Sequence, residues 1–261
     1  MNRTKIEWCD YTFNPISGCL HGCPYCYARR IAERFGGSVE TCPTGRLHEL
    51  DDVFYADPSG PADGSRFRPY PYMFDPTFHR YRLDEPQRVK KPSTIFVCSM
   101  GDLFGEWVPD EWIRQVFEAC YAAPQHRYLF LTKSPSRYDD IRGPAGWLDP
   151  DSGADFWLGA TVTNNDEMRK AYGSWARWLS VEPLLEDIHF PPRCRWVVLG
   201  AETGNRKGKI VPEKAWIDSI VRDCDYLDTP VFMKESLRPI MGDDFRQELP
   251  WEEKRSWHVV E

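Results

Sequence analysis

Six short apolar runs, most of them separated by enough chain to form a helix, constrain the fold of this chain more than any other feature. They cover residues 94–98, 128–131, 156–161, 178–181, 196–199 and 231–233. Continuous apolar runs of this length are typical of strands buried on both faces of a parallel sheet. Helices are expected over residues 25–35, 109–122 and 212–224, and the last two open with a proline, which suits a first helical position. The alternation predicts an α/β fold built from βα units, as a barrel or a doubly wound sheet.

Polar side chains follow nearly every one of these runs. They lie in Ser99-Met100-Gly101-Asp102, Thr132-Lys133, Thr163-Asn164, Glu182, Glu202 and Lys234-Glu235. The carboxyl ends of the strands of a parallel barrel open on one face, so we expect these groups to converge around one cavity. A solvated loop explains any single position equally well, and the recurrence is what favours an active site.

The 261 residues are predicted to form one domain over residues 1–250, followed by a peripheral tail at 251–261. Residues 36–92 interrupt the βα rhythm with many prolines and aromatic residues, and we interpret them as a long insertion or lid after the first helix. No apolar stretch approaches the roughly 20 residues of a membrane helix, and the N-terminus lacks a signal peptide's apolar segment. The chain is therefore expected to be cytoplasmic, with no membrane association.

A cluster of three cysteines, Cys19-x3-Cys23-x2-Cys26, follows the short extended stretch 11–15. Disulfides are not expected in a cytosolic chain, so metal binding is the leading interpretation. Three thiolates on one tight loop suit a [4Fe-4S] cluster, and they leave one iron open to a small molecule. A structural zinc site is the alternative, with a fourth ligand from Cys9, Cys42 or His21. The other cysteines, at positions 98, 120, 194 and 224, are expected to be inert core residues.

The spacing of the three cysteines, with an aromatic residue before the last, resembles the signature of the radical S-adenosylmethionine (SAM) superfamily. The segments 8–15, 99–104 and 180–185 further resemble an uncharacterised, largely phage- and prophage-associated family that is distantly similar to spore photoproduct lyase. The resemblance covers nearly the whole chain. It implies a partial (β/α) barrel of about six to seven parallel strands.

The resemblance also implies an activity and its cofactors. SAM would bind the open iron of the cluster, and the reduced cluster would cleave it to methionine and a 5'-deoxyadenosyl radical that abstracts hydrogen from a substrate. A flavodoxin or ferredoxin is the expected electron donor. A lyase or a transferase is the expected reaction class, and the catalytic residues themselves are not assigned.

Members of the superfamily usually carry a Gly-Gly-Glu-like segment after the second strand, where this chain has Met100-Gly101-Asp102. Asp102 is therefore the expected partner of the SAM amino group, with Ser99 adding a neutral hydrogen bond. A role for Asp102 in a helix cap or turn is the alternative. Tyr25 is expected to pack against the adenine.

The later strand ends supply the remaining expected cofactor contacts. Thr163 and Asn164 would hold the ribose hydroxyls or the SAM carboxylate, unless they simply form a turn. Glu182 would contact the ribose or the substrate, and Glu202 lies in a glycine-flanked segment expected near the adenine edge. Lys133 and Lys234 would hold the SAM carboxylate, a substrate phosphate or a cavity carboxylate such as Glu182.

The substrate is the least constrained part of the interpretation. Nucleic acid or a nucleotide is favoured by a basic and aromatic stretch, whose members are Arg66, Arg68, Tyr70, Tyr72, Phe74, Phe78, His79, Arg80, Tyr81, Arg82, Arg88, Lys90 and Lys91. The net charge of -7 argues against broad attraction to a polyanion. A non-catalytic iron–sulfur or zinc-stabilised binding module is the competing class of function.

Overall fold

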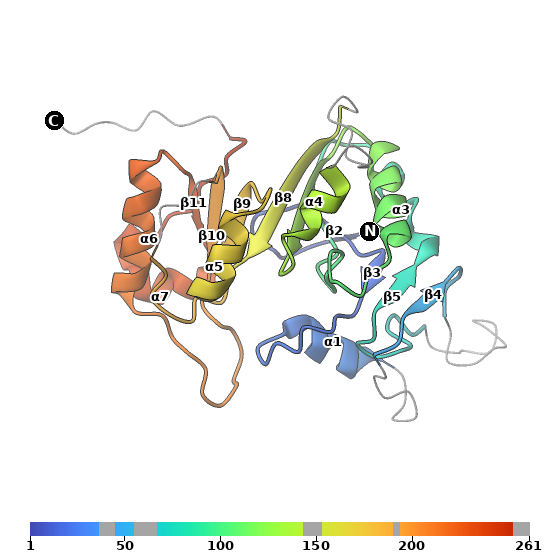
Figure 1. Ribbon diagram of the computed structural model, residues 1–261, viewed down its shortest axis with the longest axis horizontal. Coiled ribbons are helices and arrows are strands. Elements are labelled where there is room, and N and C mark those ends of the chain that lie inside the picture. Colours follow the sequence, from blue (N-terminus) through green and yellow to red (C-terminus); the bar gives the residue numbers. More distant parts are fainter. Residues whose placement is uncertain (37–44, 55–66, 143–152, 190–193, 253–261) are drawn as a thin grey trace. The chain divides into compact units, whose positions relative to one another are not determined.

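The structure is a computed structural model that describes residues 1–36, 45–54, 67–142, 153–189 and 194–252 (Figure 1). The fold is α/β, with seven parallel strands in a curled half-barrel sheet, and the strand order is β1-β2-β6-β7-β8-β9-β10-β11 with β1 as an antiparallel edge. The chain divides into two compact units, Met1–Gly159 and Ala160–Glu261. Each is described by itself below.

The first unit contains the N-terminal strands of this sheet and the helices that pack on them. The strands are β1 (Asn2–Arg3), β2 (Tyr11–Phe13), β6 (Thr94–Val97), β7 (Arg127–Thr132) and most of β8 (Asp155–Thr161). The helices are α1 (Tyr27–Phe35), α2 (Glu85–Arg88), α3 (Asp110–Tyr121) and α4 (Arg137–Arg142). Aromatic side chains form much of the core, and Phe117 of α3 stacks on Phe130 of β7 at 4.9 Å.

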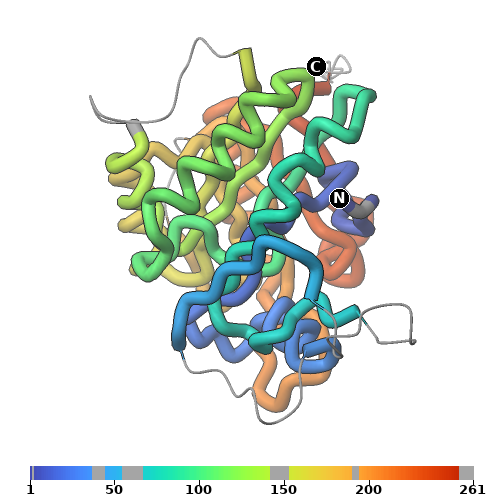
Figure 2. The backbone as a smooth tube through the Cα atoms, turned by 90° about the vertical axis from the view of Figure 1, so that its right-hand side faces the viewer, coloured from blue at the N-terminus to red at the C-terminus, as the bar shows by residue number. Residues whose placement is uncertain are grey.

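A second, smaller sheet branches from the first unit in the order β3-β5-β4. Its strands are β3 (Ile16–Ser17), β4 (His48–Leu50) and β5 (Thr77–His79), followed by the 3₁₀ turn η3 (Arg80–Arg82). Figure 2 shows β4 and β5 side by side, and both belong to the segment expected as an insertion. The described part of the insertion therefore supplies two strands that form a sheet with β3, and its role as a lid stays a prediction.

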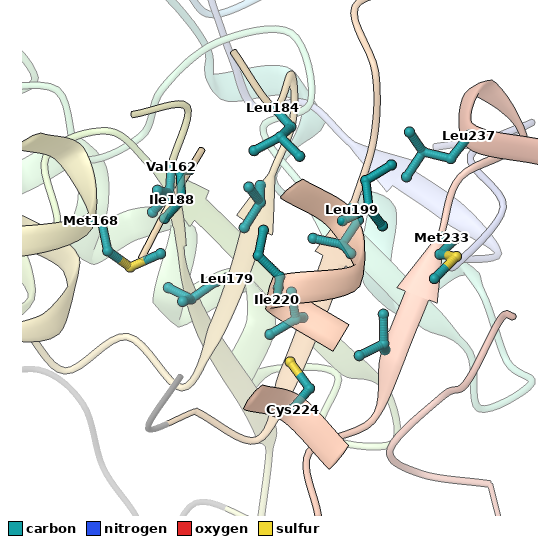
Figure 3. Packing of buried hydrophobic residues seen from close by; sticks show 14 of the residues in the cluster. Val162, Met168, Leu179, Leu184, Ile188, Leu199, Ile220, Cys224, Met233 and Leu237 are labelled. Carbon is teal, nitrogen blue, oxygen red and sulfur yellow. The ribbon is translucent and has the colours of Figure 1, made fainter. Parts of the chain in front are cut away.

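The second unit continues the parallel sheet and packs its helices around an aliphatic core (Figure 3). Its strands after β8 are β9 (Trp178–Val181), β10 (Trp196–Leu199) and β11 (Val231–Met233). Its helices are α5 (Asn165–Tyr172), α6 (Lys214–Tyr226) and α7 (Arg238–Met241), with 3₁₀ turns η4 (Glu235–Leu237) and η5 (Gly242–Asp244). Leu179, Val197 and Val231 lie on three neighbouring strands of this core.

The expected α/β class and parallel strands are confirmed, with differences at helix starts. Pro109 has extended backbone and precedes α3, and Pro212 lies two residues before the first residue of α6, so neither proline is the first helical residue. Trp251, at the start of the expected tail, packs against Trp196 with ring centroids 5.2 Å apart. Among the described helices, none has the length and apolar character needed to cross a bilayer.

Candidate functional site

Backbone hydrogen bonds from two directions fix the start of the cysteine loop. The Gly18 N–H donates to the Met100 carbonyl at 2.9 Å, which ties the loop to the turn after β6. The Cys19 N–H donates to the Phe74 carbonyl at 3.1 Å, which ties it to the insertion segment that leads into β5. The loop therefore has a defined position at the carboxyl ends of β2 and β6.

Two glycines allow this close backbone approach. Gly18 has φ +85°, and a Cβ there would lie 2.2 Å from the Asp75 carbonyl oxygen. Gly101 pairs with Gly18 in a single parallel bridge, and a Cβ on Gly101 would lie 2.8 Å from the Gly18 oxygen. No L side chain fits at Gly18 without a shift of backbone, because both the dihedral angle and the space require glycine.

Cys26 has a structural role in addition to its expected ligand role. It is the N-cap residue of α1, and its Sγ accepts a hydrogen bond from the Arg29 N–H at 3.4 Å. Ala28 and Ala32 on the buried face of α1 pack with Phe74 and Met100. The last cysteine of the motif is thus positioned by the helix that it caps.

The three cysteines form no disulfide and influence one another electrostatically. Burial, together with the negative charges of Asp102, Cys23 and Cys26, raises the pKa of the Cys19 thiol to about 12. A thiol of this kind becomes a thiolate when a cation binds nearby. No three His, Cys, Asp or Glu side chains in the described ranges form a group suited to one metal ion. A cubane cluster makes a different demand, since each cysteine binds a separate iron.

Asp102 is buried and accepts three hydrogen bonds. Its Oδ2 lies 2.8 Å from His21 Nε2 and accepts the Lys133 N–H at 3.0 Å, while its Oδ1 accepts the Phe104 N–H at 3.0 Å. His21 also contacts the Trp107 ring edge-on, with centroids 4.8 Å apart. Asp102 therefore joins the cysteine loop to two strand ends, and its expected contact with the SAM amino group stays a prediction.

Ser99 and the neighbouring backbone are organised by Asn14, which the sequence reasoning missed. Asn14 Oδ1 accepts hydrogen bonds from Ser99 Oγ and from the Met100 N–H, both at 3.1 Å. The Tyr27 hydroxyl donates to the Ser99 carbonyl at 2.6 Å. Asn14 directly follows Phe13, the last residue of β2, so a polar residue immediately after a strand is the same signal that identified the other strand-end positions.

Tyr25 lies in the loop before α1, where an adenine contact was expected. The Lys133 ammonium lies over its ring, 5.7 Å from the centroid, which is within the range of a cation–π contact. Tyr25 and Lys133 are thus brought together on the first unit, beside Asp102, whose Oδ2 accepts the Lys133 N–H.

In the second unit, Thr163 and Asn164 organise the start of α5. Asn164 is the N-cap, and its Oδ1 accepts the Glu167 N–H at 2.9 Å. Glu167 Oε2 in turn accepts the Thr163 N–H and hydroxyl, both at 2.7 Å. This arrangement corresponds to the turn-forming alternative, and the expected ribose contact of these two residues stays a prediction.

Glu182 and Lys234 form an ion pair at the ends of β9 and β11. Lys234 Nζ lies 2.6 Å from Glu182 Oε1, as one of the alternatives for Lys234 anticipated. A Cβ at Gly200 would lie 2.9 Å from Glu182 Cγ, so this glycine makes room for the carboxylate. At Gly200 the backbone therefore approaches a protein side chain closely.

Glu202 is buried, with its carboxylate held by a bidentate pair. Arg206 Nε lies 2.6 Å from Oε1, and Arg206 Nη2 lies 2.7 Å from Oε2. Such fork-shaped pairs fix both partners geometrically. Thr163, Asn164, Glu182 and Glu202 thus lie at strand ends of the second unit, and a shared cavity with the cysteine loop stays a prediction.

Several residues of the basic stretch expected to attract a polyanion form ion pairs or hydrogen bonds within the protein. Arg80 pairs with Glu49 and Asp51, and Arg88 pairs with Asp84. Arg82 donates to the Asn14 carbonyl, and His79 is buried against Ser17 at 2.8 Å. Arg66 lies outside the described residues. Carboxylates therefore neutralise the charges of Arg80 and Arg88, two of the basic residues that favoured a polyanionic substrate.

Comparisons with known proteins give one family and one similar structure. A family model described as "Protein of unknown function (DUF5131)" matches residues 3–238. A solved structure of spore photoproduct lyase complexed with dinucleoside spore photoproduct is similar with a TM-score of 0.51 and 11% identity, covering 89% of this chain and 79% of that one. No curated protein matches the sequence. The structural similarity supports the fold and not a particular reaction.

Proposed function

The chain belongs to the DUF5131 family, and from its fold and its cysteine loop we propose that it is a radical SAM enzyme that binds a [4Fe-4S] cluster through Cys19, Cys23 and Cys26. The observation that carries the proposal is the placement of three cysteines, none of them in a disulfide, on one loop at the strand ends of a partial barrel. The fold neighbour is itself spore photoproduct lyase.

The donor set of the loop suits the cluster. Cys26 is fixed by α1, and the Cys19 backbone is fixed by Phe74 and, through Gly18, by the turn after β6. The high pKa of Cys19 means that the loop needs positive charge to hold three thiolates together. When bound, the cluster and SAM would supply reductive cleavage of the sulfonium and a 5'-deoxyadenosyl radical.

The chain's own residues would bind and orient SAM. The Asp102 side chain lies close to the cysteine loop, 2.8 Å from His21 Nε2, and a carboxylate is a strong partner for an ammonium group. Ser99 and Tyr25 offer a hydroxyl and an aromatic face on the same unit. Thr163, Asn164, Glu182 and Glu202, at strand ends of the second unit, are proposed as further cofactor contacts.

For the substrate, we propose a nucleotide-containing molecule. The support is that the similar structure is a complex with dinucleoside spore photoproduct. The basic stretch 66–91 supports this less strongly, because Arg80 and Arg88 are paired with carboxylates. A single nucleotide or short single strand, recognised by a few contacts, therefore fits better than a long duplex held by many phosphate contacts.

The experiment that tests the proposal is anaerobic reconstitution followed by two measurements. Iron and sulfide are counted per chain, and 5'-deoxyadenosine is measured after addition of SAM and dithionite. We expect about four irons per chain and SAM cleavage. Replacement of Cys19, Cys23 and Cys26 together by alanine removes both signals, whereas Cys120→Ala, which alters a buried cysteine in α3, retains them.

The competing class makes different predictions for the same samples. A zinc-stabilised module gives a colourless protein that retains zinc and leaves SAM intact. An iron–sulfur protein without SAM cleavage indicates a non-catalytic electron carrier. Either result would overturn the proposed activity.

A further inference from the structure

We propose that the exposed face of α1 is the docking surface for the reductant of the cluster, an acidic electron-transfer protein of the flavodoxin or ferredoxin type. This inference rests on the proposed function, because it assigns the partner of the same cysteine loop. The docking face comprises Tyr27, Ile31 and Phe35, which recur every four residues, with Arg30 and Arg34 beside them.

The two faces of α1 differ in burial and in the size of their apolar side chains. Ala28 and Ala32 are buried against Phe74 and Met100. On the other face, Tyr27, Ile31 and Phe35 are 47%, 36% and 44% exposed. Single exposed apolar residues are ordinary, but three in register on one short helix form a stripe, and contiguous apolar surface is typical of interaction sites.

The charge beside this stripe is positive, although the chain as a whole carries -7. Arg30 and Arg34 are exposed and form no ion pair within the described part of the chain, whereas Arg80, Arg88 and Arg114 are paired with carboxylates. The one acidic residue of the helix is Glu33. A positive patch on an acidic protein favours a partner with a negative surface, because complementary potentials steer the encounter.

Distance from the cysteine loop favours a reductant over a substrate at this face. The helix begins directly after Cys26, and its nine residues span about 14 Å at 1.5 Å per residue. An electron can pass through packed protein over such distances, but hydrogen abstraction requires atomic contact with the radical. A substrate on this face would be separated from the strand ends by the helix itself.

The size of the face also suits a transient redox partner. A stripe of three apolar side chains with two flanking arginines is small, and electron-transfer complexes are at the low end of interface size. The step itself moves one electron, so the partner is oxidised by one electron and the cluster is reduced by one. No bond forms or breaks.

The test compares two routes of reduction in the reconstituted full chain. Arg30→Glu/Arg34→Glu reverses the patch, and Lys170→Glu/Arg222→Glu makes the same change in net charge at exposed positions on α5 and α6. 5'-Deoxyadenosine formation is measured with dithionite and with a purified flavodoxin and its reductase. Flavodoxin binding to each protein is measured separately by fluorescence titration at low and at high salt.

We expect the α1 variant to lose about tenfold in flavodoxin affinity and in the flavodoxin-driven rate, with the dithionite-driven rate changed less than about twofold. The Lys170/Arg222 variant should resemble the wild type in all three measurements. Ile31→Gln, which changes no charge, should weaken flavodoxin binding at high and low salt alike, because it removes apolar contact.

Results that overturn the docking surface can be distinguished from results that overturn the proposed function. Equal flavodoxin binding by the wild type and both α1 variants would overturn the docking surface even if SAM is cleaved. Loss of single-stranded oligonucleotide binding, with flavodoxin binding intact, would also overturn it and assign the face to nucleic acid. Absence of SAM cleavage with dithionite in the wild type would refute the proposed function, while the binding titration still decides the docking surface.

Discussion

The backbones of Gly18 and Gly101 meet in a single parallel bridge, so closely that a side chain on Gly101 would lie 2.8 Å from the Gly18 carbonyl oxygen. This contact joins the start of the cysteine loop to the turn after β6. It makes the position of the loop depend on two residues that carry no functional group.

Gly18→Ala is expected to destabilise the metal-free protein by about 3 kcal/mol, because it adds a positive-φ penalty to a clash with the Asp75 backbone. Gly22→Ala is the matched control, since Gly22 has φ +69° in the same loop but no atom within 4 Å of its Cβ position. It should cost about 1 kcal/mol. Urea unfolding measures both, and equal costs would show that the close approach does not matter.

Cys26 variants separate its cap role from its ligand role. Cys26→Ser keeps an acceptor for the Arg29 N–H, whereas Cys26→Ala removes it, so the alanine variant should be about 1 kcal/mol less stable without metal. Both variants should lose the cluster on reconstitution. Iron counts and urea unfolding of the metal-free proteins check this, and a serine variant that retains four irons would contradict the assignment.

Asp102 variants test whether its carboxylate does more than hold the loop. Asp102→Ala leaves the N–H groups of Phe104 and Lys133 without their acceptor and should cost about 3 kcal/mol, while Asp102→Asn should cost about half as much. If Asp102 also binds the SAM amino group, Asp102→Asn should weaken SAM binding about tenfold. Equilibrium dialysis of the reconstituted variant measures this, and unchanged affinity would restrict Asp102 to a structural role.

Gly200 and Glu182 should be energetically coupled. Gly200→Ala places a methyl group against the Glu182 side chain, which displaces the carboxylate from Lys234. We expect a cost of about 1 kcal/mol in the wild type and little cost in a Glu182→Ala background. A double-mutant cycle by urea unfolding gives the coupling, and additive effects would contradict it.

The buried His79 should make stability depend on pH. Burial, and then the charge of Arg82, lowers the pKa of His79 well below 6.5. The unfolded chain therefore binds the proton first, so the stability from neutral His79 is complete above about pH 6.5 and is lost as the pH falls toward the folded pKa. The slope reaches at most about 1.4 kcal/mol per pH unit.

His79→Gln is the variant that isolates this effect, because the Gln amide can still reach Ser17 but does not titrate. Urea unfolding of the wild type and the variant is compared between pH 7.5 and pH 5. The wild type should lose more stability over this range than His79→Gln. Parallel pH profiles would show that His79 is not the titrating group.

The sequence predicted those parts of the fold that depend on local pattern. The strands β9, β10 and β11 begin and end at the predicted residues, because each is a short, mainly apolar run bounded by charged residues, glycine or proline. The helix starts were less accurate. Pro109 and Glu213 have extended backbone, so α3 begins at the next residue, Asp110, and α6 begins at Lys214. A proline alone does not show whether it caps a helix or lies in its first turn.

The parts that the sequence did not predict depend on distant pairing. The strand β4, His48–Leu50, has no apolar alternation, and 26 residues lie between its end and the start of β5, with which it pairs. The same holds for the site, since the His21–Asp102 contact joins residues 81 positions apart. Residue type and spacing identified the cysteines. The sequence did not show which polar side chains form hydrogen bonds or ion pairs within the protein, because those contacts depend on the fold.

The hydrogen bond from the Cys19 N–H to the Phe74 carbonyl limits how this protein can be shortened or its cysteine loop transferred to another protein. Residues 70–79 supply one wall of the cysteine loop, so they belong to the same inseparable module although about fifty residues lie between them in the sequence. Transplanting residues 16–28 alone into another barrel would move the ligands without their support. A shortened protein has to retain this wall even if the rest of the insertion is trimmed.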